Sequence, residues 1–350
     1  MKRIIFVFIG LMTAVYGFSQ VNLQPAATVN LIRTEAVTIG QLRTEIERAE
    51  QITRRPLTSS ERRQILDRMI NERLFLQAAE RDRISVTENE FNEHIQQLRN
   101  VLAQQIGRQP TESEFAQAVM NDMRIDMPTF RDQLRKQLTT QKYIVEKKRD
   151  LITSVRRPTE EEIENEYLLN RTTFVRPETI RVSMILVPFG PDAASRTSAR
   201  SLADSLVREI NNDPSRFDEV AARSVLPTSA YQAGDRGYIP RNQDARSAYG
   251  QDFMDVAFNL RQGQVSRLIE GAQGFQIIKV TENYAQSNLG YNDFLQPGTR
   301  VTVRQYIEQT MASQRTQAIL IRAQQELINE LRTPRAFQIF ENTISQAGLN

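Results

Sequence analysis

Apolar residues recur every three to four positions through the first part of the chain, a pattern that predicts a series of amphipathic helices. Four stripes of this kind follow one another. Their members are Ile65, Leu66, Met69, Ile70, Leu74, Phe75, Ala78 and Ala79; Phe91, Ile95, Leu98 and Leu102; Phe115, Val119 and Met123; and Phe130, Leu134, Leu138 and Ile144. Such stripes most often form a packed core, although their methionines would also suit an adaptable binding surface.

Thr-x-x-Glu sequences mark the places where helices are expected to begin. They pair Thr58 with Glu61, Thr87 with Glu90, Thr111 with Glu114, and Thr159 with Glu162. In this spacing each side chain accepts a hydrogen bond from the other residue's backbone N–H group, which would otherwise lack a partner at a helix start. The four pairs therefore predict four helix N-termini.

After a short helix that starts near Thr159, the pattern changes from helical to alternating. Arg181–Val187 (RVSMILV) is predicted to be a strand, followed by helices at 199–210 and 217–224. Gly234, Asp235, Gly237 and Pro240 indicate a turn-rich segment. A helix at 252–260 and short strands at 266–270 and 274–281 complete the unit. The order β-α-α-(β)-α-β-β, with the bracketed strand in the turn-rich segment, predicts a small α+β domain of roughly 100 residues.

The two ends of the chain carry one predicted strand each. Ala26–Arg33 and Ala336–Phe340 have strand character, and a long amphipathic helix from Val301 to Arg332 precedes the second of them. Pro334 ends that helix. A lone strand needs a partner, so we expect the two terminal strands to pair and to close one discontinuous domain around an inserted module.

The first residues have the composition of a secretory signal peptide. Lys2 and Arg3 precede an apolar run at 4–15, and the small residues Gly17 and Ser19 follow. The run is shorter than the about 20 residues that a membrane-spanning helix needs. Export with cleavage near Gln20 is therefore expected, and a retained signal anchor is the alternative.

The composition of the chain excludes several classes of ligand and of catalytic or metal site. The formal net charge of +3 falls to +1 once Lys2 and Arg3 are removed, so charge favours neither nucleic acid nor a membrane surface. The chain has no cysteine and only one histidine, His94, which lies among polar helix residues. These counts argue against disulfides, thiolate chemistry, a Ser-His-Asp triad and a histidine zinc site. Because no GxxxxGK[ST] sequence is present, we expect no ATP, and we expect no cofactor or metal.

Residues 176–283 resemble a parvulin domain. The resemblance rests on RVSMILV as its first strand, AGDRGYIPR as its Gly-Gly-Asp-Leu-Gly-Trp turn, and FMDVAFNLRQGQVSRLIEGAQGFQIIKV as its closing helix and hairpin. Residues 20–157 resemble the SurA amino-terminal domain, best in DRMINERLFLQAAERDRISVTENEF. This resemblance implies an α+β fold: a mainly helical, discontinuous SurA-type domain closed by the C-terminal helix and strand, with an inserted domain of helices and a four-stranded antiparallel sheet.

The expected domain limits follow from this resemblance. They are a signal peptide at 1–19, a SurA-like chaperone domain at 20–157, a linker helix at 158–175, a parvulin-like domain at 176–283, and a C-terminal helix and strand, packing on the chaperone domain, at 284–350.

The positions that carry catalysis in parvulins hold other residues here. The resemblance places Met184 and Gln276 where parvulins have histidines, and Leu226 where they have Cys or Asp. Rotation of an X-Pro bond must cross a barrier of about 18–20 kcal/mol, and the hydrogen-bonding groups thought to lower it are absent. We expect no catalytic residue and a pocket that can still bind peptide. Its expected lining is Met184, Leu186, Leu226, Tyr249, Phe253, Phe258 and Gln276.

The resemblance implies an ATP-independent periplasmic chaperone, a monomer or weak dimer, whose partners are unfolded outer-membrane or other exported proteins. A helical cradle would offer them the apolar side chains of Met69, Phe75, Met123, Met127 and Phe130. Two alternatives remain. One is a residual prolyl isomerase working through Tyr249, Phe253 and Gln276, and the other is a scaffolding protein of the cell envelope.

Overall fold

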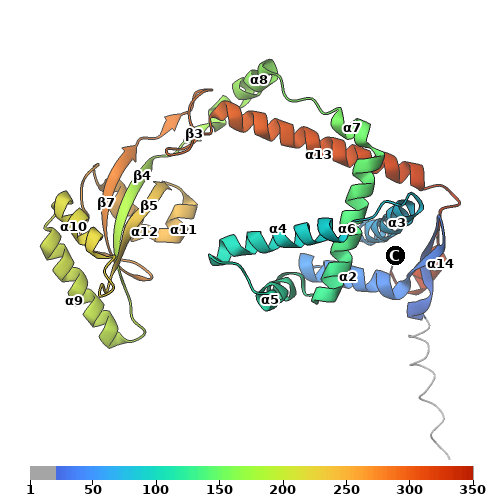
Figure 1. Ribbon diagram of the computed structural model, residues 1–350, viewed down its shortest axis with the longest axis horizontal. Helices are drawn as coiled ribbons and strands as arrows, with labels where there is room; N and C mark the ends of the chain where they lie inside the picture. Colours follow the sequence, from blue (N-terminus) through green and yellow to red (C-terminus); the bar gives the residue numbers. More distant parts are fainter. Residues whose placement is uncertain (1–20, 350) are drawn as a thin grey trace, which may run out of the picture. The chain divides into compact units, whose positions relative to one another are not determined.

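The computed structural model describes residues 21–349, so the expected signal peptide at 1–19 lies outside the described residues (Figure 1). The chain divides into two compact units. One joins the residues up to Arg156 with those from Arg315 onward, and the other runs from Arg157 to Gln314. The fold is mixed α+β, as the sequence predicted.

Helices make up most of the first unit. They are α2 (Ile39–Thr53), α3 (Ser59–Arg81), α4 (Glu88–Ile106), α5 (Glu112–Met123), α6 (Met127–Lys147), α7 (Arg149–Thr153) and α14 (Glu341–Gln346). The four predicted helix starts are confirmed, because Thr58, Thr87, Thr111 and Thr159 each form the reciprocal capping box with the glutamate three residues on. Two further boxes were not predicted: Thr38 with Gln41 begins α2, and Asp192 with Ser195 begins α9 (Ala193–Ile210).

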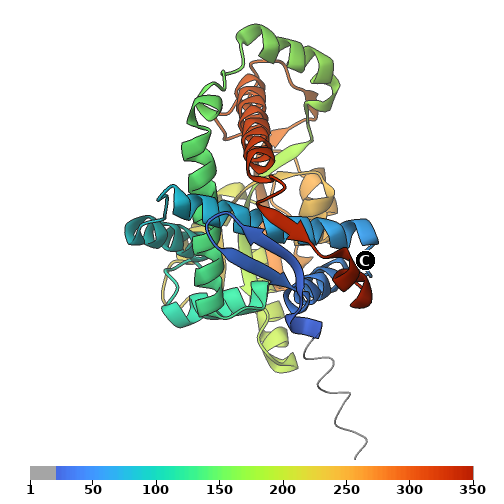
Figure 2. The same ribbon diagram turned by 90° about the vertical axis from the view of Figure 1, so that its right-hand side faces the viewer.

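A three-stranded antiparallel sheet joins the two ends of the chain, as expected. Its order is β2 (Thr34–Thr38), β1 (Pro25–Asn30) and β9 (Phe337–Ile339), with Ala27 opposite Ile339 (Figure 2). The predicted single strand at 26–33 is instead a hairpin that turns after Asn30. Buried Gln77 stabilises the turn, because its Oε1 accepts hydrogen bonds from the backbone N–H groups of Leu31 and Ile32 at 3.0 and 3.2 Å.

Two apolar cores fill this unit. The larger lies between the sheet, α2, α3 and the end of the long helix α13 (Val303–Leu331), and includes Ile70, Leu74 and Leu327. The smaller lies among α4, α5 and α6, where the Phe115 and Phe130 rings meet edge to face at 6.1 Å. The predicted helical stripes therefore serve mainly as core.

The long helix α13 contributes to both units. Near its start Val303 and Ile307 pack against Ile163 and Leu289 of the second unit, whereas Leu327 and Leu331 belong to the large core of the first. The boundary between units consequently falls inside this helix, between Gln314 and Arg315.

The second unit is built on a four-stranded antiparallel sheet, as predicted, in the order β5 (Gln232–Pro240), β4 (Thr179–Pro188), β7 (Gly274–Tyr284) and β6 (Ile269–Glu270). Alternate residues of β4 point to opposite faces. Val182 and Met184 pack with α11 (Gln243–Tyr249) and α12 (Gln251–Asn259), while Ile185 and Val187 pack with α9 (Ala193–Ile210) and α10 (Pro214–Arg223) (Figure 1).

One segment of this unit is more regular than the sequence indicated. Residues 232–240, expected to be turn-rich with one short strand, form the nine-residue strand β5 along β4. Its glycines and Asp235 sit at an irregularity in the pairing: Arg181 faces Tyr238 and Ser183 faces Asp235, so two residues of β5 oppose Val182 alone. Gly237 has a φ of 73°, which suits such a bulge. The turn residues therefore mark a kink within a strand.

A small subregion completes the second unit. It contains α8 (Glu160–Asn170), a 3-10 turn at Arg171–Thr173, and the paired short strands β3 (Val175–Arg176) and β8 (Ser287–Asn288). Tyr167 stacks on Phe174 with ring centroids 5.9 Å apart. Through the β3–β8 pair, the start and end of the sheet-bearing segment lie side by side.

Candidate functional site

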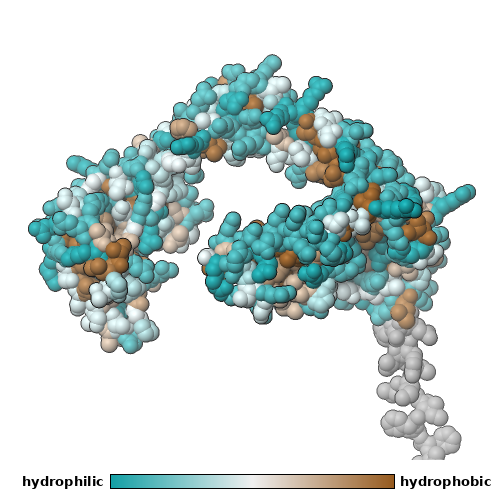
Figure 3. All heavy atoms as spheres, viewed as in Figure 1, coloured by the Kyte–Doolittle hydropathy of each residue, from teal (hydrophilic) through white to brown (hydrophobic). Residues whose placement is uncertain are grey.

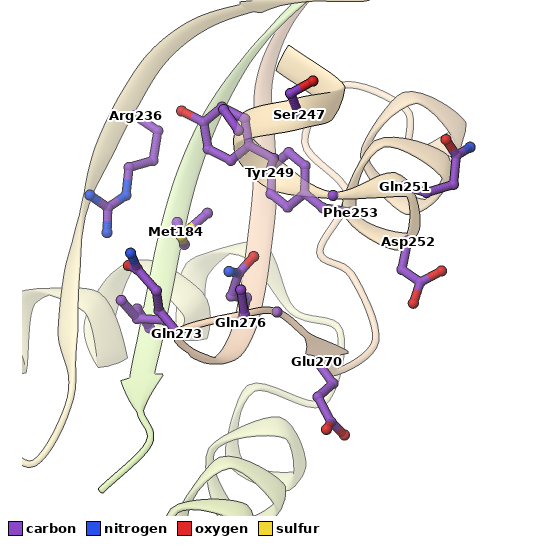
Figure 4. A pocket seen from close by; sticks show the side chains of 15 residues that line it. Met184, Arg236, Ser247, Tyr249, Gln251, Asp252, Phe253, Glu270, Gln273 and Gln276 are labelled. Atoms are coloured by element: carbon purple, nitrogen blue, oxygen red, sulfur yellow. The ribbon is translucent and has the colours of Figure 1, made fainter. Parts of the chain in front are cut away.

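The structure brings five of the seven predicted pocket residues together. Met184, Leu186, Tyr249, Phe253 and Gln276 line one cavity of about 440 Å³ (Figure 4). The cavity lies on the α11–α12 side of the sheet, because Met184 and Leu186 share one face of β4 and Gln276 shares that face of β7 with Ile278. Its volume is within the usual range for small-ligand and peptide sites.

Aromatic and aliphatic side chains form the floor of the cavity. Phe253 is 1% exposed and Met184 3% exposed, and Tyr249 stacks on Phe253 with ring centroids 4.8 Å apart. These rings come from the end of α11 and the start of α12, which follow each other with Gly250 between them. A side chain that enters the cavity can therefore be buried against rigid apolar surface, which is the main source of affinity in such sites.

Gln276 supplies a polar group without a partner. It is 9% exposed and lies between Leu186 on β4 and Ile269 on β6, and within the described residues its buried Oε1 accepts no hydrogen bond. Its Nε2 packs on Gly271, where a Cβ atom would stand only 2.4 Å away. A buried amide oxygen without a donor costs about 1–3 kcal/mol, so a donor brought by a ligand would be favourable.

The other two predicted pocket residues lie elsewhere. Leu226 is 53% exposed in the turn that follows α10, and it does not line the cavity. Phe258 is 7% exposed and packs into the core beneath α12. It lies five residues after Phe253, about 140° around the helix, so the two rings point in different directions.

Charged and amide residues that the sequence did not point to lie at the rim of the cavity. Arg236 on β5, Asp252 on α12, and Glu270 and Gln273 around the β6–β7 turn also line the cavity. One signal was available: Arg236 occupies the leucine position of the Gly-Gly-Asp-Leu-Gly-Trp turn that AGDRGYIPR resembles. Asp252 and Gln273 gave no comparable signal, because sheet pairing and helix placement bring them to the rim.

The chaperone-groove candidates separate into two places. Met69 and Phe75 lie with Ile144 at the bottom of a hollow of about 920 Å³ between α2, α3 and α6. They are 8% and 2% exposed, so the expected apolar cradle is mostly covered. The walls are polar, and their amide side chains include Gln64, Gln133, Gln137, Gln141 and Gln324.

Two of the remaining candidates, Phe130 and Met127, belong to the smaller core of the first unit, and Met123 lies outside it. Phe130 is 7% exposed there and Met127 packs against it, whereas Met123 at the end of α5 is 49% exposed. None of the three lines the hollow. The face drawn in Figure 3 carries small, separate hydrophobic areas among hydrophilic ones.

Within residues 21–349 no helix is both long enough and apolar enough to cross a membrane. The same part of the chain contains no group of three or more His, Cys, Asp or Glu side chains that could hold a metal ion.

Two family descriptions match the chain. Residues 1–144 match the SurA-like N-terminal domain, and residues 167–284 match the PPIC-type PPIASE domain. Among curated proteins, the foldase protein PrsA of Staphylococcus aureus (strain Newman) is 33% identical over 82 residues, which is 23% of this chain and 24% of that protein. The same values hold for PrsA of strain N315. The match thus spans about a quarter of the length of these relatives.

Solved structures with similar chains are more distant. One comes from work on PEB4 and Cj1289, two structurally related SurA-like chaperones of Campylobacter jejuni; it is 14% identical, with a TM-score of 0.36 over 90% of this chain and 98% of that one. The peptidylprolyl isomerase PrsA of Bacillus cereus is 17% identical, with a TM-score of 0.25 over 93% of this chain and 99% of that one.

Proposed function

We propose that the chain is a SurA-like chaperone, since residues 1–144 match the SurA-like N-terminal domain and residues 167–284 match the PPIC-type PPIASE domain. On this proposal it holds unfolded polypeptides without ATP, and its PPIC-type domain binds peptide without catalysing isomerisation. The observation that carries this proposal is the lining of the cavity. Aromatic and aliphatic side chains form its floor around the uncharged amide of Gln276, its charged side chains stand at the rim, and no ionisable side chain occupies the positions of Met184, Leu226 or Gln276.

The argument against catalysis concerns the twisted amide of the transition state. To accelerate rotation, a site must stabilise the twisted peptide bond more strongly than either planar form. At the three parvulin positions, Met184 offers only weak acceptor capacity, Leu226 lies outside the cavity, and Gln276 brings a single amide. The other hydrogen-bonding groups, among them Arg236 and Gln273, stand at the rim. Apolar contacts with Tyr249 and Phe253 bind planar and twisted forms alike, so they give affinity without acceleration.

The hollow of the first unit is the proposed holding surface. Charges of both signs line it, including Arg48, Arg68, Glu45 and Glu72, so it would not select clients by net charge. The amides of Gln133, Gln137 and Gln141 recur every four residues on α6 and make no side-chain hydrogen bond within the described residues. Such groups can donate to and accept from the backbone of an extended chain whatever its side chains.

The setting of this activity is also part of the proposal. The chaperone would act in the periplasm after export and cleavage near Gln20, as a monomer or weak dimer, on unfolded outer-membrane and other exported proteins. Its chaperone domain would span residues 20–157 and its parvulin-like domain residues 176–283. The resemblance and the signal-like residues 1–19 support this assignment.

Two assays on one preparation test the proposal. We expect the protein to suppress aggregation of an unfolded outer-membrane barrel and to leave the exchange rate of a prolyl peptide, measured by NMR, at its uncatalysed value. Met184→His, Gln276→His and Leu226→Asp together should create measurable exchange catalysis. Because Leu226 lies outside the cavity, the two histidine substitutions alone should give most of that gain.

Wild-type protein that matches an active parvulin in the exchange assay would contradict the proposal and support the isomerase alternative. Protein that neither suppresses aggregation nor catalyses exchange would support the scaffolding alternative.

A further inference from the structure

The cavity of the second unit has an uneven distribution of charge. Arg236 lies on the β5 side, and Asp252 and Glu270 lie on the opposite side, beyond Phe253 and Gln276 (Figure 4). Glu270 already has a partner, since it forms an ion pair with Arg196 of α9. The guanidinium of Arg236 has no ion pair and no hydrogen bond within the described residues. The β5 side of the cavity therefore presents an uncompensated cation.

The bulge in β5 explains why Arg236 reaches the cavity. Arg236 and Gly237 together oppose Val182, and the Gly237 N–H donates to Oδ1 of Asp235 at 2.8 Å. Asp235 is held in turn by Arg181, whose guanidinium donates to its Oδ2. A bulge leaves its extra residue outside the regular pairing and redirects its side chain. Arg236 is thus presented by a fixed turn of the backbone.

The chemistry of Arg236 specifies the ligand. The planar array of N–H donors of a guanidinium matches a carboxylate in a two-point contact. Beside it the cavity offers an aromatic floor from Tyr249 and Phe253. A ligand that fits both features carries a carboxylate next to an apolar or aromatic side chain.

We propose that Arg236 makes the cavity selective for peptide segments in which a carboxylate adjoins an apolar or aromatic residue. This inference rests on the proposed peptide-binding role of the cavity. The carboxylate has two possible sources in a polypeptide, the C-terminal carboxyl group or the side chain of Asp or Glu. In either case the apolar residue is buried against Tyr249 and Phe253 and the carboxylate binds Arg236.

Three fluorescent peptides that share one apolar sequence test this selectivity on the full chain. The first ends in Phe with a free carboxylate, the second ends in Phe amide, and the third ends in Phe amide with Asp before the Phe. We expect at least one carboxylate-bearing peptide to bind roughly three- to tenfold more tightly than the neutral one, the range for an ion pair at a partly exposed site.

Substitution of Arg236 should remove this preference. In Arg236→Gln, the affinity for the favoured peptide is expected to fall to that for the neutral peptide, and the affinity for the neutral peptide should not change. Arg236→Lys should keep part of the preference. The matched control is Arg246→Gln, because Arg246 is exposed on α11, makes no ion pair within the described residues and does not line the cavity. The Arg246→Gln variant should prefer the carboxylate-bearing peptide as strongly as the wild type does. Thermal melts show whether each variant is folded.

The outcomes separate this inference from the proposed function. Preference for the first peptide alone supports recognition of a chain terminus, and preference for the third supports an acidic side chain. Equal binding of all three peptides to the wild type, or a preference that survives Arg236→Gln, would overturn the inference and leave peptide binding intact. No binding of any peptide would overturn the peptide-binding role and the inference with it.

Discussion

The carboxylate of Glu90 on α4 binds both the N-cap residue of its own helix and a lysine of α6. Its Oε2 accepts a hydrogen bond from the Thr87 backbone N–H at 2.8 Å, and both oxygens lie within 3 Å of Nζ of Lys142 on α6. These contacts, the one with Lys142 foremost, lower the pKa of Glu90 to about 2. In the same way the pKa values of Glu61 and Glu114 fall to about 2, with Arg55 and Arg108 as the main causes.

The first prediction is an acid sensitivity of this unit. A carboxyl group with a lowered pKa in the folded state binds its proton more readily when unfolded, where a glutamate titrates near pH 4.3. Its contribution to stability is therefore complete above about pH 5 and is lost as the pH falls toward 2. We expect the urea midpoint to decrease across this range.

Glu90→Gln tests the source of that effect. The variant should be less stable than the wild type at pH 7, and the difference should shrink as the pH approaches 2. Glu93→Gln serves as control, because Glu93 is an exposed glutamate of the same helix with no ion pair within the described residues. A difference between Glu90→Gln and the wild type that stays constant from pH 7 to pH 2 would contradict the argument.

At the scale of single elements, β9 and α14 hold the first unit closed. β9 covers one edge of β1, and Ile344 of α14 is 4% exposed in the large core. Deletion of residues 333–350 would remove both, exposing an edge of β1 and the apolar surface beneath α14. We expect the truncated protein to melt at a clearly lower temperature or to aggregate.

A milder variant tests the same contact without removing backbone. Ile344→Ala should lower the free energy of unfolding by about 2–5 kcal/mol, the usual cost of truncating a buried isoleucine. Gln346→Ala, at an exposed site of the same helix, should change it by less than about 0.5 kcal/mol. If deletion and Ile344→Ala both leave thermal unfolding unchanged, the discontinuous unit is not the cooperative structure described here.

Elements with local signals were predictable from the sequence, and elements fixed by distant contacts were less so. The capping boxes of α3, α4, α5 and α8 involve residues three apart, so their sequence alone specifies them. Strand β5 was expected only as a strand within a turn-rich segment, without bounds, because Gly234 and Gly237 are typical turn residues and its pairing partner lies about 50 residues away in β4. The strand near Ala26 was found, but not its hairpin, because Gln77 stabilises the turn from a helix far along the chain.

The candidate site was predictable to a similar degree. Residues on the regular strand positions of β4 and β7 entered the cavity as the resemblance implied. Leu226 did not, because the turn after α10 places it outside, and Arg236 was not expected because a bulge redirects it. In the first unit, helical spacing identified Met69 and Phe75 as apolar positions but could not tell that neighbouring helices cover them.

At the scale of the whole molecule, the β3–β8 pair suggests that the sheet-bearing segment can be removed. Val175 lies directly opposite Asn288 in this antiparallel pair, and such partners have Cα atoms about 4.5–5.5 Å apart. A short Gly-Ser linker can therefore replace residues 176–287. We expect the shortened protein to fold and to keep suppressing aggregation, if the hollow of the first unit is the holding surface.

The complementary fragment provides the control. Residues 175–288 alone should fold, since the sheet and its two apolar cores lie within this segment, and should bind peptides without suppressing aggregation. Circular dichroism and both binding assays check these outcomes. Loss of aggregation suppression in a folded, shortened protein would place the holding activity in the excised segment instead.

The pairing of β1 with β9 also means that the three-stranded sheet can form only after nearly the whole chain has been synthesised. Ala27 cannot pair with Ile339 until Ile339 has been synthesised, and the roughly 300 residues between them take roughly 15 to 60 s to translate. During that interval the sheet-bearing segment can fold while the hairpin β1–β2 still lacks a neighbour along one edge. A growing chain of this protein thus exposes an unpaired strand edge to other unfolded chains for most of its synthesis. It would itself gain from the protection that a folded copy is proposed to give.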